Sequence, residues 1–170
     1  MAVRHHPFWL LKLNLLGLTQ LVMATAGLAS MDPGIGRLER SPKRCITAGG
    51  DDNKRPCSAL RLDRKSDHVL RVRFTGMKGA MGTVESFSFV STNPRLSLPL
   101  TCRQGQCNPP TGTWQGTVIG AARSVTDALG LVQGLPKAWP ARGTCSISPL
   151  RVVCEAHLTN GNSFRGEASF

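Results

Sequence analysis

Six cysteines are the residues whose type and spacing most clearly indicate chemistry in this chain: Cys45, Cys57, Cys102, Cys107, Cys145 and Cys154. An even number of cysteines in an exported protein is typical of disulfide bonds, although sequence alone does not choose among the many possible pairings. The sequential arrangement, 45–57, 102–107 and 145–154, is the most economical because each bridge then closes a short loop. We expect such bridges to stabilise small β-hairpins.

Metal binding is the competing use of these cysteines. The gaps within the three sequential pairs are eleven, four and eight residues. Zinc sites, by contrast, usually have pairs of ligand cysteines that are separated by about two to four residues. We therefore expect no metal site and no cofactor.

Catalysis has little support in the sequence. The chain lacks G-x-S-x-G, H-E-x-x-H, the phosphate-binding P-loop and G-x-G-x-x-G. His68 and His157 are possible general bases, but strand alternation places Glu155 and His157 together on a solvent-facing side, as an ordinary surface pair. We predict no catalytic residue, and a small hydrolase using either histidine is the least favoured function.

The short loop between the second pair of cysteines is the best candidate for a rigid recognition element. It carries Arg103, Gln104 and Gln106 within the 102–107 interval. A loop that is already closed loses less entropy when it binds a partner. This feature favours one alternative function, a secreted inhibitor or toxin-like effector that presents the loop.

Two further places could bind a partner. Trp139 lies between two prolines and near Lys137, so its ring either stacks on a sugar or partner surface or folds back to cover the core. Arg71 and Arg73 alternate with apolar residues. This spacing places both arginines on the polar face of a strand, where they are candidates for binding anions.

The N-terminus has the order of a secretory signal peptide. Arg4 and Lys12 precede an apolar run at 13–23, and Ala24-Thr25-Ala26 supplies a cleavage site after residue 26, with a second site after residue 29. An uncleaved anchor is the alternative, but the apolar run is shorter than the roughly twenty residues that span a bilayer. We expect a leader at 1–26, a basic irregular segment at 27–67 and a β-rich globular domain at 68–170, with no transmembrane segment after cleavage.

The charge of the chain limits the classes of partner. The net charge is +11, and loss of Arg4 and Lys12 with the leader lowers it to +9. Such a charge favours an anionic polysaccharide, a membrane surface or an envelope protein, and export disfavours nucleic acid. The charge could instead serve only solubility. The favoured function is a non-enzymatic binding or structural module for an anionic glycan or protein, exported to a bacterial periplasm or beyond.

Alternating apolar residues predict short strands separated by turns. Residues 58–62, 68–74, 83–90 and 113–122 have strand patterns, and 151–159 and 163–170 flank the hairpin dipeptide Asn160-Gly161. Residues 96–100 contain a proline and should form an edge strand or an irregular segment. Residues 124–139 are predicted to form a short helix or a turn. The expected fold is mainly β, a small antiparallel sheet, sandwich or barrel with at most one short helix.

Overall fold

A computed structural model describes residues 34–50, 53–96 and 98–170, all within one compact unit that begins at Met31. The predicted signal peptide, with its cleavage sites after residues 26 and 29, lies outside the described residues.

Eleven strands and one 3-10 turn account for the regular structure of the described residues. The elements are β1 (Gly36–Arg40), β2 (Arg44–Gly49), β3 (Arg55–Arg64), β4 (Val69–Gly76), η1 (Ala80–Gly82), β5 (Val84–Thr92), β6 (Cys102–Arg103), β7 (Gly105–Cys107), β8 (Trp114–Thr126), β9 (Lys137–Ile147), β10 (Arg151–Leu158) and β11 (Ser163–Ser169).

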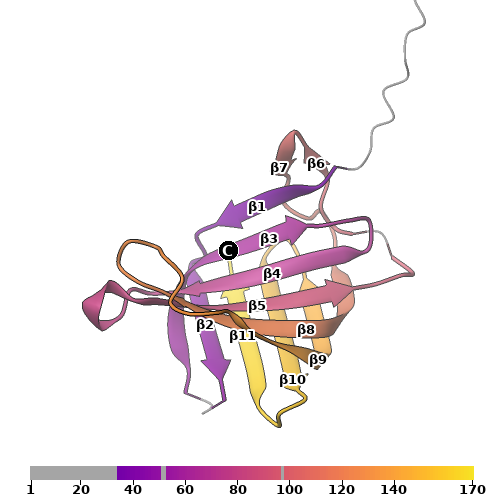
Figure 1. The fold of residues 1–170 in the computed structure, drawn as a ribbon. Coiled ribbons are helices and arrows are strands. Elements are labelled where there is room, and N and C mark those ends of the chain that lie inside the picture. Colours follow the sequence, from indigo (N-terminus) through magenta and orange to yellow (C-terminus); the bar gives the residue numbers. More distant parts are fainter. Residues whose placement is uncertain (1–33, 51–52, 97) are drawn as a thin grey trace, which may run out of the picture. The chain divides into compact units, whose positions relative to one another are not determined.

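Eight of these strands close into an antiparallel barrel (Figure 1). Strands β2, β3, β4, β5, β8, β9, β10 and β11 pair in chain order, and β11 pairs back with β2. Strands β3, β4, β5 and β8 cross β2, β11, β10 and β9 steeply in Figure 1. The predicted mainly β, antiparallel fold is confirmed, and a barrel is the architecture that it adopts.

The ladder between β2 and β3 is the shortest in the barrel wall. Only Ile46–Pro56 and Thr47–Arg55 pair there, and further along its length β3 pairs with β1 instead. The disulfide between Cys45 and Cys57 bridges these two strands next to that ladder. This covalent bond therefore holds the barrel closed where few hydrogen bonds do so.

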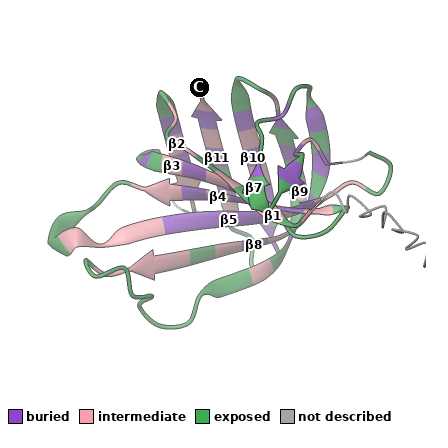
Figure 2. Cartoon of the chain, turned by 90° about the horizontal axis from the view of Figure 1, so that it is seen from above, coloured by how far each residue is buried: buried purple, intermediate pink, exposed green. Residues whose placement is uncertain are grey.

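Side chains that point into the barrel form its core, and the buried residues are coloured purple along the strands in Figure 2. One cross-strand row runs from Leu62 through Val72 and Phe89 to Ala121, all at most 3% exposed. Alternation along each strand directs these residues inward and their neighbours to solvent. An eight-stranded barrel has an interior just wide enough for side chains to fill.

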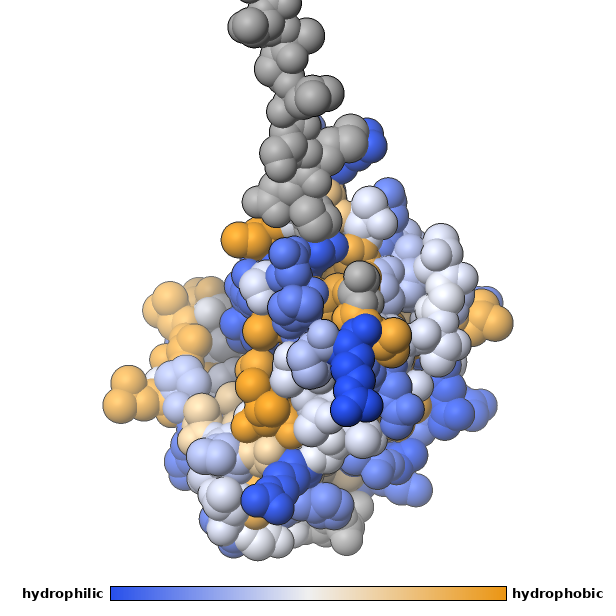
Figure 3. Space-filling model, turned by 90° about the vertical axis from the view of Figure 1, so that its right-hand side faces the viewer, coloured by the Kyte–Doolittle hydropathy of each residue, from blue (hydrophilic) through white to orange (hydrophobic). Residues whose placement is uncertain are grey.

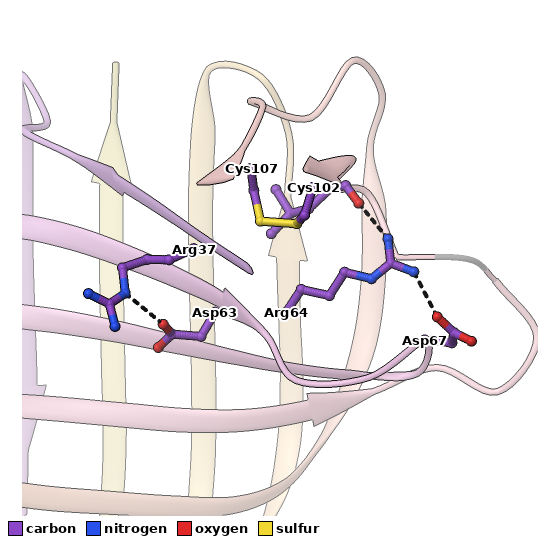
Figure 4. The surroundings of a disulfide bond; sticks show 7 residues. Arg37, Asp63, Arg64, Asp67, Cys102 and Cys107 are labelled. Atoms are coloured by element: carbon purple, nitrogen blue, oxygen red, sulfur yellow. Dashed lines mark hydrogen bonds and ion pairs between the residues drawn. A yellow bond between two sulfur atoms is a disulfide. The ribbon is translucent and has the colours of Figure 1, made fainter. Parts of the chain in front are cut away.

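The connection between β5 and β8 closes one end of the barrel. Leu98 and Leu100 are buried there, and the 102–107 disulfide joins β6 and β7 in a hairpin that lies against β1. The buried Arg64 of β3 links this connection to the barrel wall. Its guanidinium group donates a hydrogen bond of 2.7 Å to the carbonyl oxygen of Leu100 and one of 2.9 Å to the carboxylate of Asp67 (Figure 4). Figure 3 shows that side of the molecule as a mosaic of hydrophilic and apolar residues.

The sequential disulfide pairing is confirmed. Each of the three bridges joins two strands that are adjacent in the sheet, and none of the six cysteines is free. The third bridge, between Cys145 and Cys154, is fully buried between directly paired residues of β9 and β10.

Two expectations about secondary structure were wrong. The segment 27–67 was expected to be irregular, yet its described part contains β1, β2 and β3. Pairing of β2 with β11, of β3 with β4 and of β1 with β3 orders these residues despite their many charges. The helix considered for 124–139 is also absent, because β8 extends to Thr126 and β9 begins at Lys137. The alternative of a turn is correct. Residues 98–100 are irregular, as one of the two alternatives for 96–100 predicted.

Replacing Arg64 tests the closure of this end. We expect Arg64→Met to lower the free energy of unfolding by about 1–3 kcal/mol, because the Leu100 carbonyl and Asp67 each lose a charged donor. Denaturant unfolding measures the loss, and amide exchange should quicken around residues 98–101. Arg142→Met, at an exposed position of β9, is the control and should have little effect. Equal stability of the two variants would contradict this role for Arg64.

Candidate functional site at the open end of the barrel

The other end of the barrel contains a cavity of about 460 Å³. The loops that connect β2 to β3, β4 to β5, β8 to β9 and β10 to β11 all lie at this end. Polar residues from all four of these strand pairs and their loops contribute to the lining together with aromatic rings: Thr47, Asn53, Arg55, Glu85, Phe87, Arg123, Lys137, Trp139, Asn160, Asn162 and Phe164. We refer to this space as the mouth cavity.

Three aromatic rings line the mouth cavity. Phe87 and Phe164 meet edge to face with their ring centroids 4.9 Å apart, and Trp139 packs on Phe164 at 5.7 Å in the same manner. Gly49 allows this packing, because a Cβ at residue 49 would lie 2.8 Å from the ring of Phe87. The three rings come from β5, β9 and β11 and pack on one another across the opening of the barrel.

The cavity is a shallow cup. Below its floor, the fully buried rings of Phe74 and Phe89 pack edge to face at 5.8 Å. Phe74 reaches across the interior to β11, where a Cβ at Gly166 would lie 2.5 Å from its ring. Together with the other buried side chains of the core, these rings fill the interior beneath the cavity.

Charged side chains lie above the aromatic rings. Glu85, whose side chain is 17% exposed, accepts a hydrogen bond of 2.9 Å from Arg55 and pairs also with Arg123. Lys137 lies beside Arg123 in the pairing of β8 with β9, and no described carboxylate is within ion-pair distance of it. Among the described residues, the lining of the mouth cavity thus has three cations and one carboxylate.

The position of Arg123 depends on an irregularity in β8. Trp114, Gly116 and Val118 face inward, but a register shift at Ile119 reverses the alternation. Beyond the shift Arg123 is paired with the inward-facing Phe87 of β5. A β-bulge changes which face successive side chains occupy, and periodicity alone does not locate one.

The structure places the predicted binding residues in three separate regions. Lys137 and Trp139 both line the mouth cavity, and Trp139 also packs against the core. Of the two roles considered from sequence, packing against the core is shown, and stacking on a partner stays a prediction. Arg55, Glu85 and Arg123, which sequence analysis did not select, lie with them.

The hairpin residues lie at the opposite end of the molecule. The hairpin of β6 and β7 exposes Arg103, Gln104 and Gln106. It lies at the closed end of the barrel, away from the loops around the mouth cavity. Gln104 has a φ of 50°, in the region that glycine tolerates best. The hairpin is a separate surface from the mouth cavity.

Arg71 and Arg73 lie on the outer face of the barrel in a cluster around Asp63. Arg71 donates to Asp63 at 2.8 Å, and Arg61 and Arg37 approach the same carboxylate at 2.9 and 3.2 Å. The side chain of Asp63 is only 4% exposed, since these arginines cover it. Arg71 is therefore largely occupied by an intramolecular carboxylate.

Arg73 has a different environment within the same cluster. It donates to the hydroxyl of Ser88 at 3.2 Å, and no carboxylate among the described residues pairs with it directly. Burial lowers the pKa of Arg73, and repulsion from Arg71 and Arg61 lowers it further. It remains the more available of the two arginines for an external anion.

The two histidines proposed as general bases lie away from the mouth cavity. His68 is exposed in the turn before β4, at the closed end, and His157 is exposed on the outer face of β10. Glu155 shares that face but pairs with Arg165. Within residues 34–50, 53–96 and 98–170, no three His, Cys, Asp or Glu side chains are grouped in a way that could hold a metal ion.

Comparison with known proteins provides no family assignment. No protein-family model matches the chain, and no curated protein or solved structure is significantly similar to it. In the part of the chain that the structure describes, no helix is both long and apolar enough to cross a membrane.

Acid should weaken the cluster around Asp63. Burial raises the pKa of Asp63, but hydrogen bonds from Arg61 and Arg71 outweigh this effect and bring the pKa below the usual 3.8. The carboxylate therefore stabilises the folded state above that value, and this contribution disappears as the pH falls through the folded-state pKa. We expect Asp63→Asn to cost about 1–3 kcal/mol at neutral pH. The variant and the wild type should converge under acid.

Unfolding curves at a series of pH values measure this effect. Glu155→Gln is the matched control, because its side chain is 45% exposed, and it should change stability little at any pH. An Asp63→Asn variant that loses the same stability at neutral and acid pH would contradict the role assigned to the ionised carboxylate.

Proposed function

We propose that this protein is a non-enzymatic binding protein that holds an anionic saccharide in the mouth cavity. The observation that carries the proposal is the combination of an aromatic floor with Arg55, Arg123 and Lys137 above it. Aromatic rings pack on the apolar faces of sugar rings, while guanidinium and ammonium groups bind carboxylates. The cavity volume of about 460 Å³ falls in the usual range for small-molecule sites, roughly 300–1,000 Å³.

The polar lining supports a sugar over a purely apolar ligand. Asn53, Asn160, Asn162 and Thr47 add amide and hydroxyl groups around the opening, and such groups match the hydroxyls of a saccharide. The floor formed by Phe87 and Phe164 lies above a filled interior, which favours a compact ring over an extended chain. A non-enzymatic role is supported because both candidate histidines lie elsewhere and Glu85 is engaged by two arginines.

Calorimetry with a uronic-acid disaccharide tests the site. We expect Trp139→Ala to weaken binding by about tenfold or more, because the variant loses the indole face on which the sugar would pack. Stacking of a nucleic-acid base on an aromatic side chain, a contact of a similar kind, contributes on the order of 1–3 kcal/mol. Lys137→Gln should weaken binding of the acid but not of its neutral methyl ester, since only the acid presents a charge to the ammonium group.

Arg103→Gln is the matched control, because it also removes one exposed cation, from the hairpin at the closed end. It should bind the acid as the wild type does. Loss of binding in Arg103→Gln, with Lys137→Gln unaffected, would instead favour the alternative of an inhibitor or effector that presents the 102–107 hairpin. No binding of acidic saccharides by the wild type would refute the proposal.

We also propose that the protein is exported through its N-terminal leader to the periplasm or the exterior of a bacterial cell. Three disulfides with no free cysteine are compatible with an oxidising compartment. Protein recovered from outside the cytosol should begin at Gly27 or Ser30, as N-terminal sequencing would reveal. A chain that begins at Met1 and contains reduced cysteines would contradict export.

A further inference from the structure

Exposed apolar side chains are concentrated in two loops beside the mouth cavity. Ten large hydrophobic residues are exposed in the described part of the chain, and six of them belong to residues 77–83 and 127–136. These six are Met77 (58% exposed), Met81 (89%), Leu129 (84%), Leu131 (63%), Val132 (50%) and Leu135 (91%). We refer to the two segments as the paired loops.

The paired loops touch one another. Gly82 packs so closely on Ala128 that a Cβ at residue 82 would lie 2.7 Å from that of Ala128. Both loops project from the barrel at the left of Figure 1, beyond the ends of β4, β5 and β8. Their apolar side chains therefore form one protruding surface rather than two unrelated ones.

Hydrogen bonds give each loop a defined shape. Asp127 accepts the amide hydrogens of Leu129 and Leu131 at 2.9 Å, and the amide of Gly79 donates to the carbonyl of Thr83 at 2.8 Å. Met81 has a φ of 59°, a conformation that a glycine would adopt at lower cost. The loops thus display large apolar residues in fixed positions where smaller polar residues would be more usual.

The charges around the paired loops are mostly positive. Lys78 and Lys137 lie in or beside them, and the carboxylate of Asp127 is used to shape its own loop. Arg55 and Arg123 at the mouth cavity add two cations against Glu85. Apolar side chains that protrude among cations match the chemistry of a bilayer surface with anionic headgroups.

We infer that the paired loops dock the open end of the barrel onto a membrane that contains anionic lipid. The apolar tips enter the boundary between headgroups and acyl chains, while Lys78 and Lys137 lie at the level of the headgroups. A protruding surface enters a lipid layer directly, whereas a second copy of the chain would have to offer a matching groove. This inference does not depend on what the mouth cavity binds, although docking would direct that cavity toward the membrane surface.

Sedimentation with lipid vesicles tests the inference on the full chain. We expect binding to vesicles of phosphatidylcholine with phosphatidylglycerol, and much weaker binding to phosphatidylcholine alone or at high salt. Leu129→Ser/Leu135→Ser should lower the partition coefficient by about tenfold or more, because two leucine side chains no longer leave water. Both positions are largely exposed, so the fold should be unaffected.

Leu150→Ser is the matched control, because Leu150 is also exposed (70%) but lies in the turn between β9 and β10, away from the paired loops. It should bind vesicles as the wild type does. All variants retain the same residues 1–33, so a difference between them reports on the substituted side chains. Amide exchange followed by peptide mass analysis should show protection of residues 77–83 and 127–136 on vesicles.

Three results would overturn the inference. Equal partitioning of the double variant and the wild type would remove the role of the leucines. Protection confined to other peptides would place the membrane contact elsewhere. Self-association without lipid that Leu129→Ser/Leu135→Ser abolishes would assign the paired loops to an interface between copies of the chain.

Discussion

The packing of Phe74 across the barrel onto Gly166 decides where the interior ends and the mouth cavity begins. An interior of eight strands is narrow enough that a few aromatic rings fill a layer of it. Phe74 and Phe89 fill the layer directly beneath the cavity, where Phe74 is the cross-strand partner of Phe87, so Phe87 and Phe164 become a floor with open space above. The absence of a side chain on β11 at residue 166 is what allows this division.

The two ends of the barrel are built by different means. At the closed end, the long connection between β5 and β8, with its disulfide hairpin, covers the interior and excludes solvent, and the buried Arg64 holds this connection in place. At the open end, the two longest loops project outward and leave the last inward-facing positions of the strands uncovered. Inward alternation therefore continues past the apolar core and brings polar residues such as Glu85 and Arg123 into the cavity. The same pattern that builds the core also positions the site.

Local features of the fold could be predicted from the sequence, whereas long-range ones could not. The hairpin at Asn160-Gly161 and the sequential disulfides depend on residues close together in the chain. The pairing of β2 with β11, by contrast, joins the beginning of the barrel to its end. No local pattern marks residues 36–49 as strands, and they are ordered by pairing with other strands, β1 with β3 and β7, and β2 with β11 and β3. For the site, Lys137 and Trp139 stood out by composition, but Arg123 depends on the register shift at Ile119.

The carboxylate of Glu85 lies in a cavity that we propose binds anions, and its presence there has a physical explanation. Three cations around a partly enclosed cavity would repel one another, and that repulsion would destabilise the fold. Glu85 pairs with two of them and fixes the guanidinium groups of Arg55 and Arg123 in the mouth. Glu85 neutralises only one unit of charge, so the described lining keeps a net positive charge. Lys137 is the cation of this lining with no described carboxylate within ion-pair distance. An anionic ligand would therefore reach Lys137 directly, whereas it would have to compete with Glu85 for the guanidinium groups of Arg55 and Arg123.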